Sequence, residues 1–192
     1  MSTDPARERI LDCAEDLFYA RGIQHVGMDA VRDAAGVTLR RLYQVFPSKG
    51  DLVEAYLARR DARWLSGLAA HVDTAARSPR ARLLAVFDWL EDWFAQPDFR
   101  GCAFVNSFGE LGGTSPQVAA AARRHKDAFH AYLRELATAA GATADTGTQI
   151  ALLAEGAMTT AAVSGTTAPA RHAKQAALLL LTLDAREVAS PA

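Results

Sequence analysis

Proline and glycine divide this sequence into segments of helical length, and the apolar residues between them recur with the 3.6-residue period of an α-helix. The first segment opens at Asp4-Pro5, because an aspartate can cap a helix and a proline suits its first turn, and it closes at Gly22. Its apolar residues form one stripe: Ile10, Cys13, Ala14, Leu17 and Phe18. The spacing of these proline and glycine residues therefore predicts helices from the start of the chain.

The composition favours the same fold. The sequence contains 41 Ala but only 3 Ile and 11 Val, and alanine favours helices whereas β-branched residues favour strands. The helix breakers predict about nine helices, three short ones followed by six mostly longer ones. We expect an all-α protein.

Charge and cysteine content argue against several classes of protein. With 21 Lys and Arg against 22 Asp and Glu, no overall field draws the chain to nucleic acid or to an acidic membrane, although a local basic face is allowed. Cys13 and Cys102 are too few for a disulfide scaffold and lack the spacing of a zinc site. No apolar run reaches the roughly 18 residues of a membrane span, and the first residues do not resemble a secretory signal. We expect a cytoplasmic protein without a metal or another cofactor.

Two short helices near the front of the chain carry the most information. The first covers residues 28–35, a turn follows at Gly36, and Thr38 can cap a second helix that reaches about Phe46. This arrangement is typical of a helix-turn-helix. Residues 34–50 include three basic side chains and no acidic one. Positive charge is thus concentrated where a chain of neutral net charge would need it to bind DNA phosphates.

The second short helix supplies the candidate DNA contacts. Arg40 and Arg41 could each form two hydrogen bonds to a guanine edge or bind phosphates, and Gln44 could serve adenine. The alternative interpretation is a solvated helix face, because a basic pair on a helix is usually just surface. The predicted DNA-binding residues are Thr38, Leu39, Arg40, Arg41, Tyr43, Gln44 and Lys49.

Residues 7–57 resemble the amino-terminal domain of TetR-type transcriptional regulators. The resemblance depends on Phe18, Gly22, Ala34-Ala35-Gly36-Val37-Thr38, Leu42-Tyr43, Phe46-Pro47-Ser48-Lys49 and Asp51-Leu52. It implies a helix-turn-helix DNA-binding domain over residues 1–48, and a helical effector-binding and dimerisation domain over residues 49–192.

The chain departs from the family pattern at two places. Arg40 and Arg41 stand where the family commonly has a small residue and a threonine, and Val26-Gly27 stand where it often has serine or threonine. Compared with the family pattern, we expect this chain to lose one contact with the phosphate backbone of DNA. We expect its two arginines to reach further toward bases or phosphates.

The resemblance also implies a homodimer, and a physical argument supports it. A helix-turn-helix reads only a few base pairs, so two half-sites about one helical turn apart are usually needed. The run Leu178–Leu181 has apolar groups all round, which favours burial against a second subunit, although this helix could instead be central in its own domain. The predicted interface residues are Ile150, Leu153, Ala157, Met158, Leu178 and Leu181.

Aromatic residues gather in the middle of the chain, and the resemblance implies a cavity for a small hydrophobic effector. An apolar cavity with a few polar groups suits such a ligand, but an aromatic stripe is also typical of plain core. The candidate effector-binding residues are Phe87, Trp89, Trp93, Phe104, Asn106, Phe108, His125, Phe129 and Glu155.

These observations predict a DNA-binding transcriptional repressor that a small hydrophobic effector releases from a palindromic, double-stranded operator. The alternative is a dimeric DNA-binding protein that needs no ligand. An enzyme is not expected, because the sequence has no catalytic motif and His125 and His130, five residues apart, do not share a helical face. No membrane partner is expected.

Overall fold

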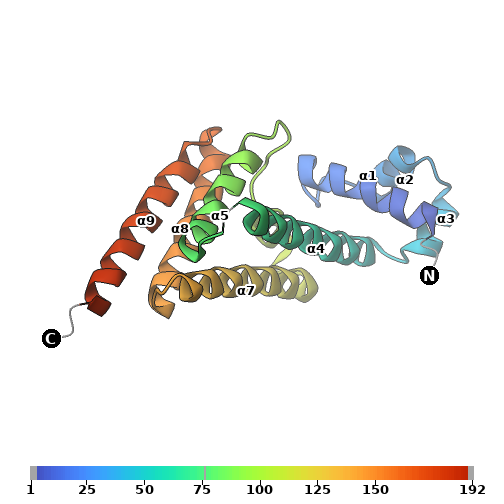
Figure 1. Cartoon of the computed structure of the whole chain (residues 1–192). Helices are drawn as coiled ribbons and strands as arrows, with labels where there is room; N and C mark the ends of the chain where they lie inside the picture. Colours follow the sequence, from blue (N-terminus) through green and yellow to red (C-terminus); the bar gives the residue numbers. More distant parts are fainter. Residues whose placement is uncertain (1–3, 76, 190–192) are drawn as a thin grey trace. The chain divides into compact units, whose positions relative to one another are not determined.

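The computed structural model describes residues 4–75 and 77–189, and over these ranges the chain forms nine helices and no strand (Figure 1). None of the described helices is long and apolar enough to cross a membrane. The prediction of an all-α fold is confirmed. The helices are α1 Pro5–Arg21, α2 Met28–Ala35, α3 Leu39–Val45, α4 Lys49–Ala75, α5 Pro79–Phe94, α6 Ala103–Leu111, α7 Pro116–Ala139, α8 Ala144–Ser164 and α9 Ala168–Ala189.

The helix starts follow from local chemistry. The Asp4 carboxylate accepts a hydrogen bond from the Ala6 backbone N–H at 3.0 Å at the start of α1. The Thr38 hydroxyl caps α3, and the Ser78 hydroxyl caps α5. Each of these side chains satisfies a backbone donor that would otherwise lack a partner. By contrast, Gly27 at the start of α2 makes no side-chain cap, in keeping with its departure from the family pattern.

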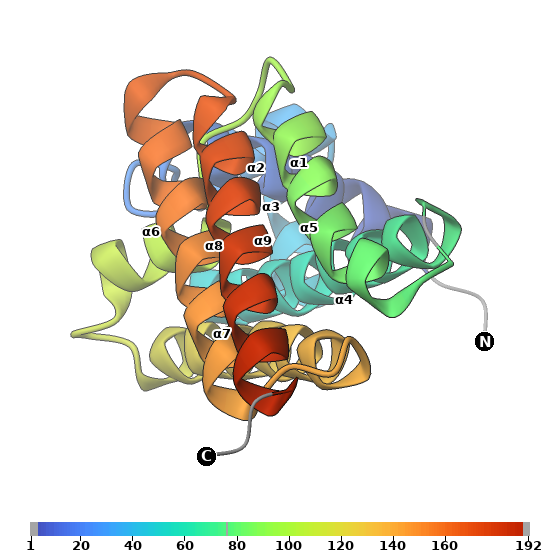
Figure 2. The ribbon, with the colours of Figure 1, turned by 60° about the vertical axis from the view of Figure 1, so that its left-hand side comes forward.

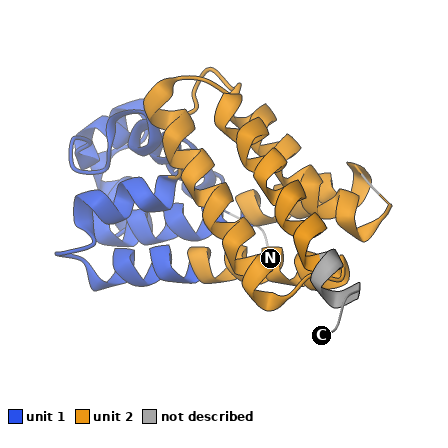
Figure 3. Cartoon of the chain, turned by 90° about the vertical axis from the view of Figure 1, so that its left-hand side faces the viewer, with its two compact units in different colours: residues 1–62, 103–124 blue, residues 63–102, 125–192 orange. Residues whose placement is uncertain are grey.

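The chain divides into two compact units, and neither is continuous in sequence (Figure 3). The first unit comprises residues 1–62 and 103–124, and the second comprises residues 63–102 and 125–192. Helices α4 and α7 therefore contribute residues to both units. The division into functional domains at residue 48 stays a prediction.

In the first unit, apolar packing and a buried ion-pair network join α1 to α4. The rings of Phe18 and Tyr56 meet edge to face, with their centroids 5.6 Å apart. Glu15, which is only 9% exposed, binds two arginines of α4: its carboxylate lies 2.9 Å from Arg59 Nη2 and 3.1 Å from Arg60 Nη1. Because each buried charge has its partners, the network fixes the register of α1 against α4 without leaving an unpaired ion.

In the second unit, α8 and α9 lie side by side, and α5 packs against both (Figure 2). The buried face of α8 includes Ala151, Ala154 and Ala161, whose small side chains allow neighbouring helices to come close. Two ion pairs reinforce the packing of α5 on α9: Lys174 with Asp88 at 2.5 Å, and Arg171 with Glu91.

A carboxylate of α9 caps the start of α8. The Thr143 backbone N–H donates to Asp184 Oδ2 at 2.6 Å, and Asp184 is buried. This hydrogen bond, aided by the hydroxyls of Thr146 and Thr143, holds the pKa of Asp184 below its ordinary value even though burial acts in the opposite direction. The ionised form is therefore the one that stabilises the fold.

We expect Asp184→Asn to lower the thermal midpoint at neutral pH, because the amide keeps an acceptor oxygen but loses the charge. The folded pKa is depressed, so the contribution of the charge is complete above the ordinary aspartate value of about 3.9 and is lost as the pH falls further. The midpoint difference between wild type and variant, followed by circular dichroism, should therefore shrink below that pH. A difference that stays constant with pH would contradict this assignment.

Candidate nucleic-acid interface

Helix α3 is held on the first unit by two buried side chains. Leu42 is fully buried and Phe46 is 3% exposed, so the inner face of the helix belongs to the core. The preceding turn depends on Gly36, which has a φ of 60° and donates its N–H to the carbonyls of Arg32 and Asp33. Only glycine adopts this conformation without a steric penalty. The turn and the core together orient the outer face of α3.

That outer face carries most of the predicted DNA contacts. Thr38, Leu39, Arg40, Tyr43 and Gln44 are exposed. Leu39 and Tyr43 are 42% and 44% exposed, so both side chains are accessible to a partner. Apolar side chains can contact the thymine methyl group in the major groove, and arginine and glutamine can bind base edges. The exposed face therefore combines the chemistry needed to read DNA.

The two adjacent arginines of α3 differ in their environment. Arg40 is exposed and makes no hydrogen bond or ion pair within the described residues. Arg41 is half-buried, and its Nη2 lies 2.5 Å from Oδ2 of Asp4. Arg40 is therefore free to meet DNA, whereas Arg41 already has an acidic partner that the sequence did not predict.

Lys49 is half-buried at the first position of α4. Burial lowers the pKa of its ammonium group, and the nearby carboxylate of Glu110 partly offsets this effect. The lysine is thus less available to phosphates than its sequence position suggests, although it still contributes positive charge beside α3.

Glu110 also joins α6 to the loop between α1 and α2. Its carboxylate accepts from the Gln24 backbone N–H at 2.8 Å, and the Gln24 side-chain amide donates to the Glu110 carbonyl at 2.5 Å. A Cβ on Gly22 would lie 3.0 Å from the same carboxylate, and Gly22 has a φ of +84°. The positive φ favours glycine here, and the carboxylate of Glu110 packs closely against it. Local sequence patterns do not reveal this contact, because it joins residues 86 positions apart.

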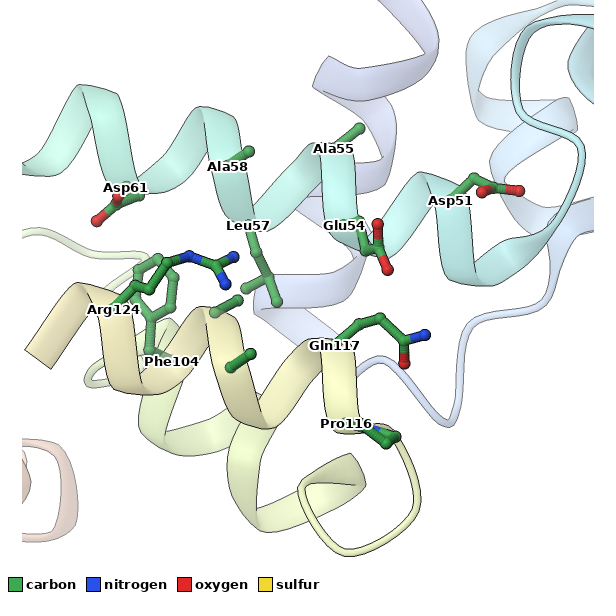
Figure 4. Close-up of a pocket in the computed structure, with 12 residues that line it drawn as sticks. Asp51, Glu54, Ala55, Leu57, Ala58, Asp61, Phe104, Pro116, Gln117 and Arg124 are labelled. Carbon is green, nitrogen blue, oxygen red and sulfur yellow. The ribbon is translucent and has the colours of Figure 1, made fainter.

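A groove of about 680 Å³ lies between α4 and α7 within the first unit. Figure 4 shows Glu54 and Asp61 on its α4 side and Arg124 on its α7 side, with Phe104 of α6 beneath. Phe104 is the only predicted effector residue in this lining. The charged walls differ from the mainly apolar cavity that we expected.

Four of the other eight predicted effector residues belong to an aromatic cluster in the second unit. Trp64 of α4 is its centre: its ring contacts Trp89, Trp93, His125 and Phe129 at centroid distances of 4.8, 5.6, 5.2 and 5.1 Å, all edge to face. Trp64 is not among the residues predicted from the sequence, although its spacing from Leu57 and Leu68 places it on the apolar stripe of α4.

The remaining candidates are dispersed. Glu155 binds Lys126 at 2.6 Å, and Phe87 is buried in the core of the second unit. Asn106 lines a small pocket of about 220 Å³ in the first unit, and Phe108 is 49% exposed there. The nine predicted effector residues therefore do not form one site within either unit.

The predicted dimer residues lie mainly on the inner side of the second unit. Leu153 is half-buried and Leu178 is 42% exposed, whereas four others are buried: Ile150, Ala157, Met158 and Leu181. Those four already contact their own subunit. The large apolar side chains that α8 and the described part of α9 expose to solvent are Leu152, Val163, Leu178, Leu179 and Leu183.

Two family models match this sequence. Residues 10–56 match the model described as bacterial regulatory proteins, tetR family. Residues 79–177 match the tetracyclin repressor-like C-terminal domain. The first match includes α2 and α3, and the second extends from α5 into α9.

Similar proteins agree with these matches. The HTH-type transcriptional activator FasR of Mycolicibacterium smegmatis is 36% identical over 117 residues, which are 61% of this chain and about half (52%) of FasR. The solved structure of SCO4454, a TetR-family transcriptional regulator from Streptomyces coelicolor, is 30% identical, with a TM-score of 0.82 over 93% of this chain and 95% of that chain. The reduced form of E. coli NemR has a TM-score of 0.82 over 91% of this chain and 95% of that chain, and at 22% identity it shows a likeness of fold.

Proposed function

The chain belongs to the TetR family of bacterial regulatory proteins and is a DNA-binding transcriptional regulator, and we propose that it is a homodimeric repressor that reads a palindromic operator through α3. The observation that carries this proposal is the exposed face of α3, where Arg40 has no partner within the described residues and large apolar side chains face solvent. A dimer that covers its operator blocks transcription without any further contact, whereas an activator needs an additional surface for the transcription machinery. Repression is therefore the simpler interpretation, although the relative FasR is named an activator.

Selection of binding sites from random DNA tests the role of α3. We expect a palindrome with its half-sites about one helical turn apart. Arg40→Ala should weaken binding to the selected site. If Arg40 contacts a base, preference at one position relaxes, with a loss of about 1–3 kcal/mol; if it contacts a phosphate, affinity falls for every sequence and the salt slope becomes shallower.

Arg123→Ala is the matched control, because Arg123 is also exposed but lies on α7. It should leave the selected site unchanged. An Arg40→Ala protein that binds like this control would contradict the proposed role of α3. Placing the selected operator in a promoter shows whether the protein represses or activates transcription. Lower transcription in the presence of the protein supports a repressor, and higher transcription supports an activator.

The second subunit is proposed to cover the exposed apolar side chains of α8 and α9. Leu152, Leu179 and Leu183 are 61%, 66% and 56% exposed on two helices that lie side by side, and large apolar surfaces are usually buried in an interface. An isologous dimer would use the same two helices from each copy.

Leu179→Glu should convert the dimer to a monomer, because two buried carboxylates would oppose each other across a twofold axis. Light scattering after size exclusion measures the mass. Val105→Glu is the control: Val105 is 42% exposed on α6 in the first unit, and its replacement should leave the dimer intact. A Leu179→Glu protein of unchanged dimeric mass would place the interface elsewhere.

The effector is proposed to be a small hydrophobic molecule that binds against the aromatic cluster around Trp64. Helix α4 supports a route from this cluster to the DNA-reading unit, because the same helix carries Trp64, the arginines that bind Glu15, and Lys49 beside α3. A ligand that binds more tightly to one conformation of the protein than to another, with α4 placed differently in each, shifts the population of DNA-binding conformations.

All three tryptophans of the chain lie in the proposed effector site, so their intrinsic fluorescence reports it directly. In a screen of hydrophobic compounds, an effector should change this fluorescence, raise the thermal midpoint and weaken operator binding; at 100 times its Kd it stabilises the protein by about 2.7 kcal/mol. Compounds that release operator without a fluorescence change would place the site elsewhere. If none of the bound compounds alters operator affinity, the ligand-independent alternative is favoured.

A further inference from the structure

Each oxygen of the Asp4 carboxylate accepts a hydrogen bond, one from a residue of α1 and the other from a residue of α3. Oδ1 accepts from the Ala6 backbone N–H at 3.0 Å, which caps α1. Oδ2 accepts from Arg41 Nη2 at 2.5 Å, which ties α1 to the recognition helix across 37 positions of sequence. The cap holds the carboxylate in place, and the carboxylate in turn holds the guanidinium.

The pair lies at the surface rather than in the core. The Asp4 and Arg41 side chains are 38% and 43% exposed, and Arg41 neighbours the exposed Arg40 on α3. Exposed ion pairs are weak and screened by salt, so this pair can open when a better acceptor arrives. Until it opens, an approaching phosphate meets a neutral pair at Arg41, and of these two arginines only Arg40 has no partner within the described residues.

We propose that Asp4 is a positioning residue that sets the DNA specificity of this regulator by competing with phosphates for Arg41. A phosphate on random DNA offers Arg41 an anionic oxygen, which is what Asp4 already supplies, so opening the pair brings little benefit. The phosphate and the guanine edge can each accept two hydrogen bonds from the guanidinium, but only a correct sequence places a guanine edge opposite Arg41. The pair therefore withholds one positive charge from nonspecific DNA and releases it on the operator. This inference rests on the proposed function, in which α3 reads DNA, and on the contact of Arg41 with DNA that the sequence predicts.

Asp4→Asn tests the competition without removing the helix cap, because asparagine caps helices about as well as aspartate but cannot form the ion pair. Dissociation constants are measured over a range of salt concentrations on a duplex selected by the wild-type protein and on a scrambled duplex of the same composition. The variant should bind the scrambled duplex more tightly, with a salt slope steeper by about 0.9 for each additional phosphate that it neutralises. The ratio of the two affinities should fall roughly five- to tenfold, as expected for the loss of one base discrimination.

Asp16→Asn is the matched control. Asp16 lies on the same helix, is exposed, and makes no hydrogen bond or ion pair within the described residues, so its replacement changes the net charge by the same amount. If Asp4→Asn changes the affinity ratio no more than Asp16→Asn does, the proposal is overturned. Circular dichroism melting of both variants verifies that α1 is intact.

The Arg41→Ala background separates an effect through Arg41 from direct repulsion between Asp4 and DNA. Without Arg41, Asp4→Asn should no longer change the affinity ratio, because general repulsion acts equally on both duplexes. A change of ratio that persists in this background overturns the proposal. If Arg41→Ala by itself leaves operator binding unchanged, the proposed DNA contact fails; if it weakens binding while Asp4→Asn has no effect, only the role of Asp4 fails.

Discussion

Helix α3 has only seven residues, and an isolated helix of that length is not stable in water. Its conformation depends on the Thr38 cap at one end and on the burial of Leu42 and Phe46 along its inner face. Since these contacts use one face, the other face is exposed to solvent. The exposed Leu39 and Tyr43 are thus a consequence of how the helix is held.

The unit that presents α3 is assembled from segments far apart in the sequence. Glu15 anchors α1 to the arginines of α4, and Glu110 anchors α6 to the loop after α1. Both anchors are carboxylates that accept directional hydrogen bonds, which fix orientation more sharply than apolar packing does. Within this unit, these hydrogen bonds join α4 to α1 and α6 to the loop that follows α1.

Sequence periodicity predicted the helices well but did not show which apolar residues of a helix stay exposed in the folded chain. Ile150 and Leu152 are both apolar residues on α8, yet Ile150 is fully buried whereas Leu152 is 61% exposed. A hydrophobic period shows that a helix has an apolar face, but not how much of it neighbouring helices of the same subunit will cover. Trp64 was missed for the related reason that its ring partners come from two other helices, α5 and α7.

The sequence by itself determined the helices, their caps and the turn at Gly36, because these depend on backbone sterics and on hydrogen bonds between residues close in the chain. It also determined which residue types the recognition helix offers to DNA. Only the tertiary structure decided that Arg40 has no partner among the residues it describes while Arg41 is bound to Asp4, and that Glu110 contacts Gln24. These pairings depend on distances across the folded chain, and neither local propensity nor periodicity encodes such distances.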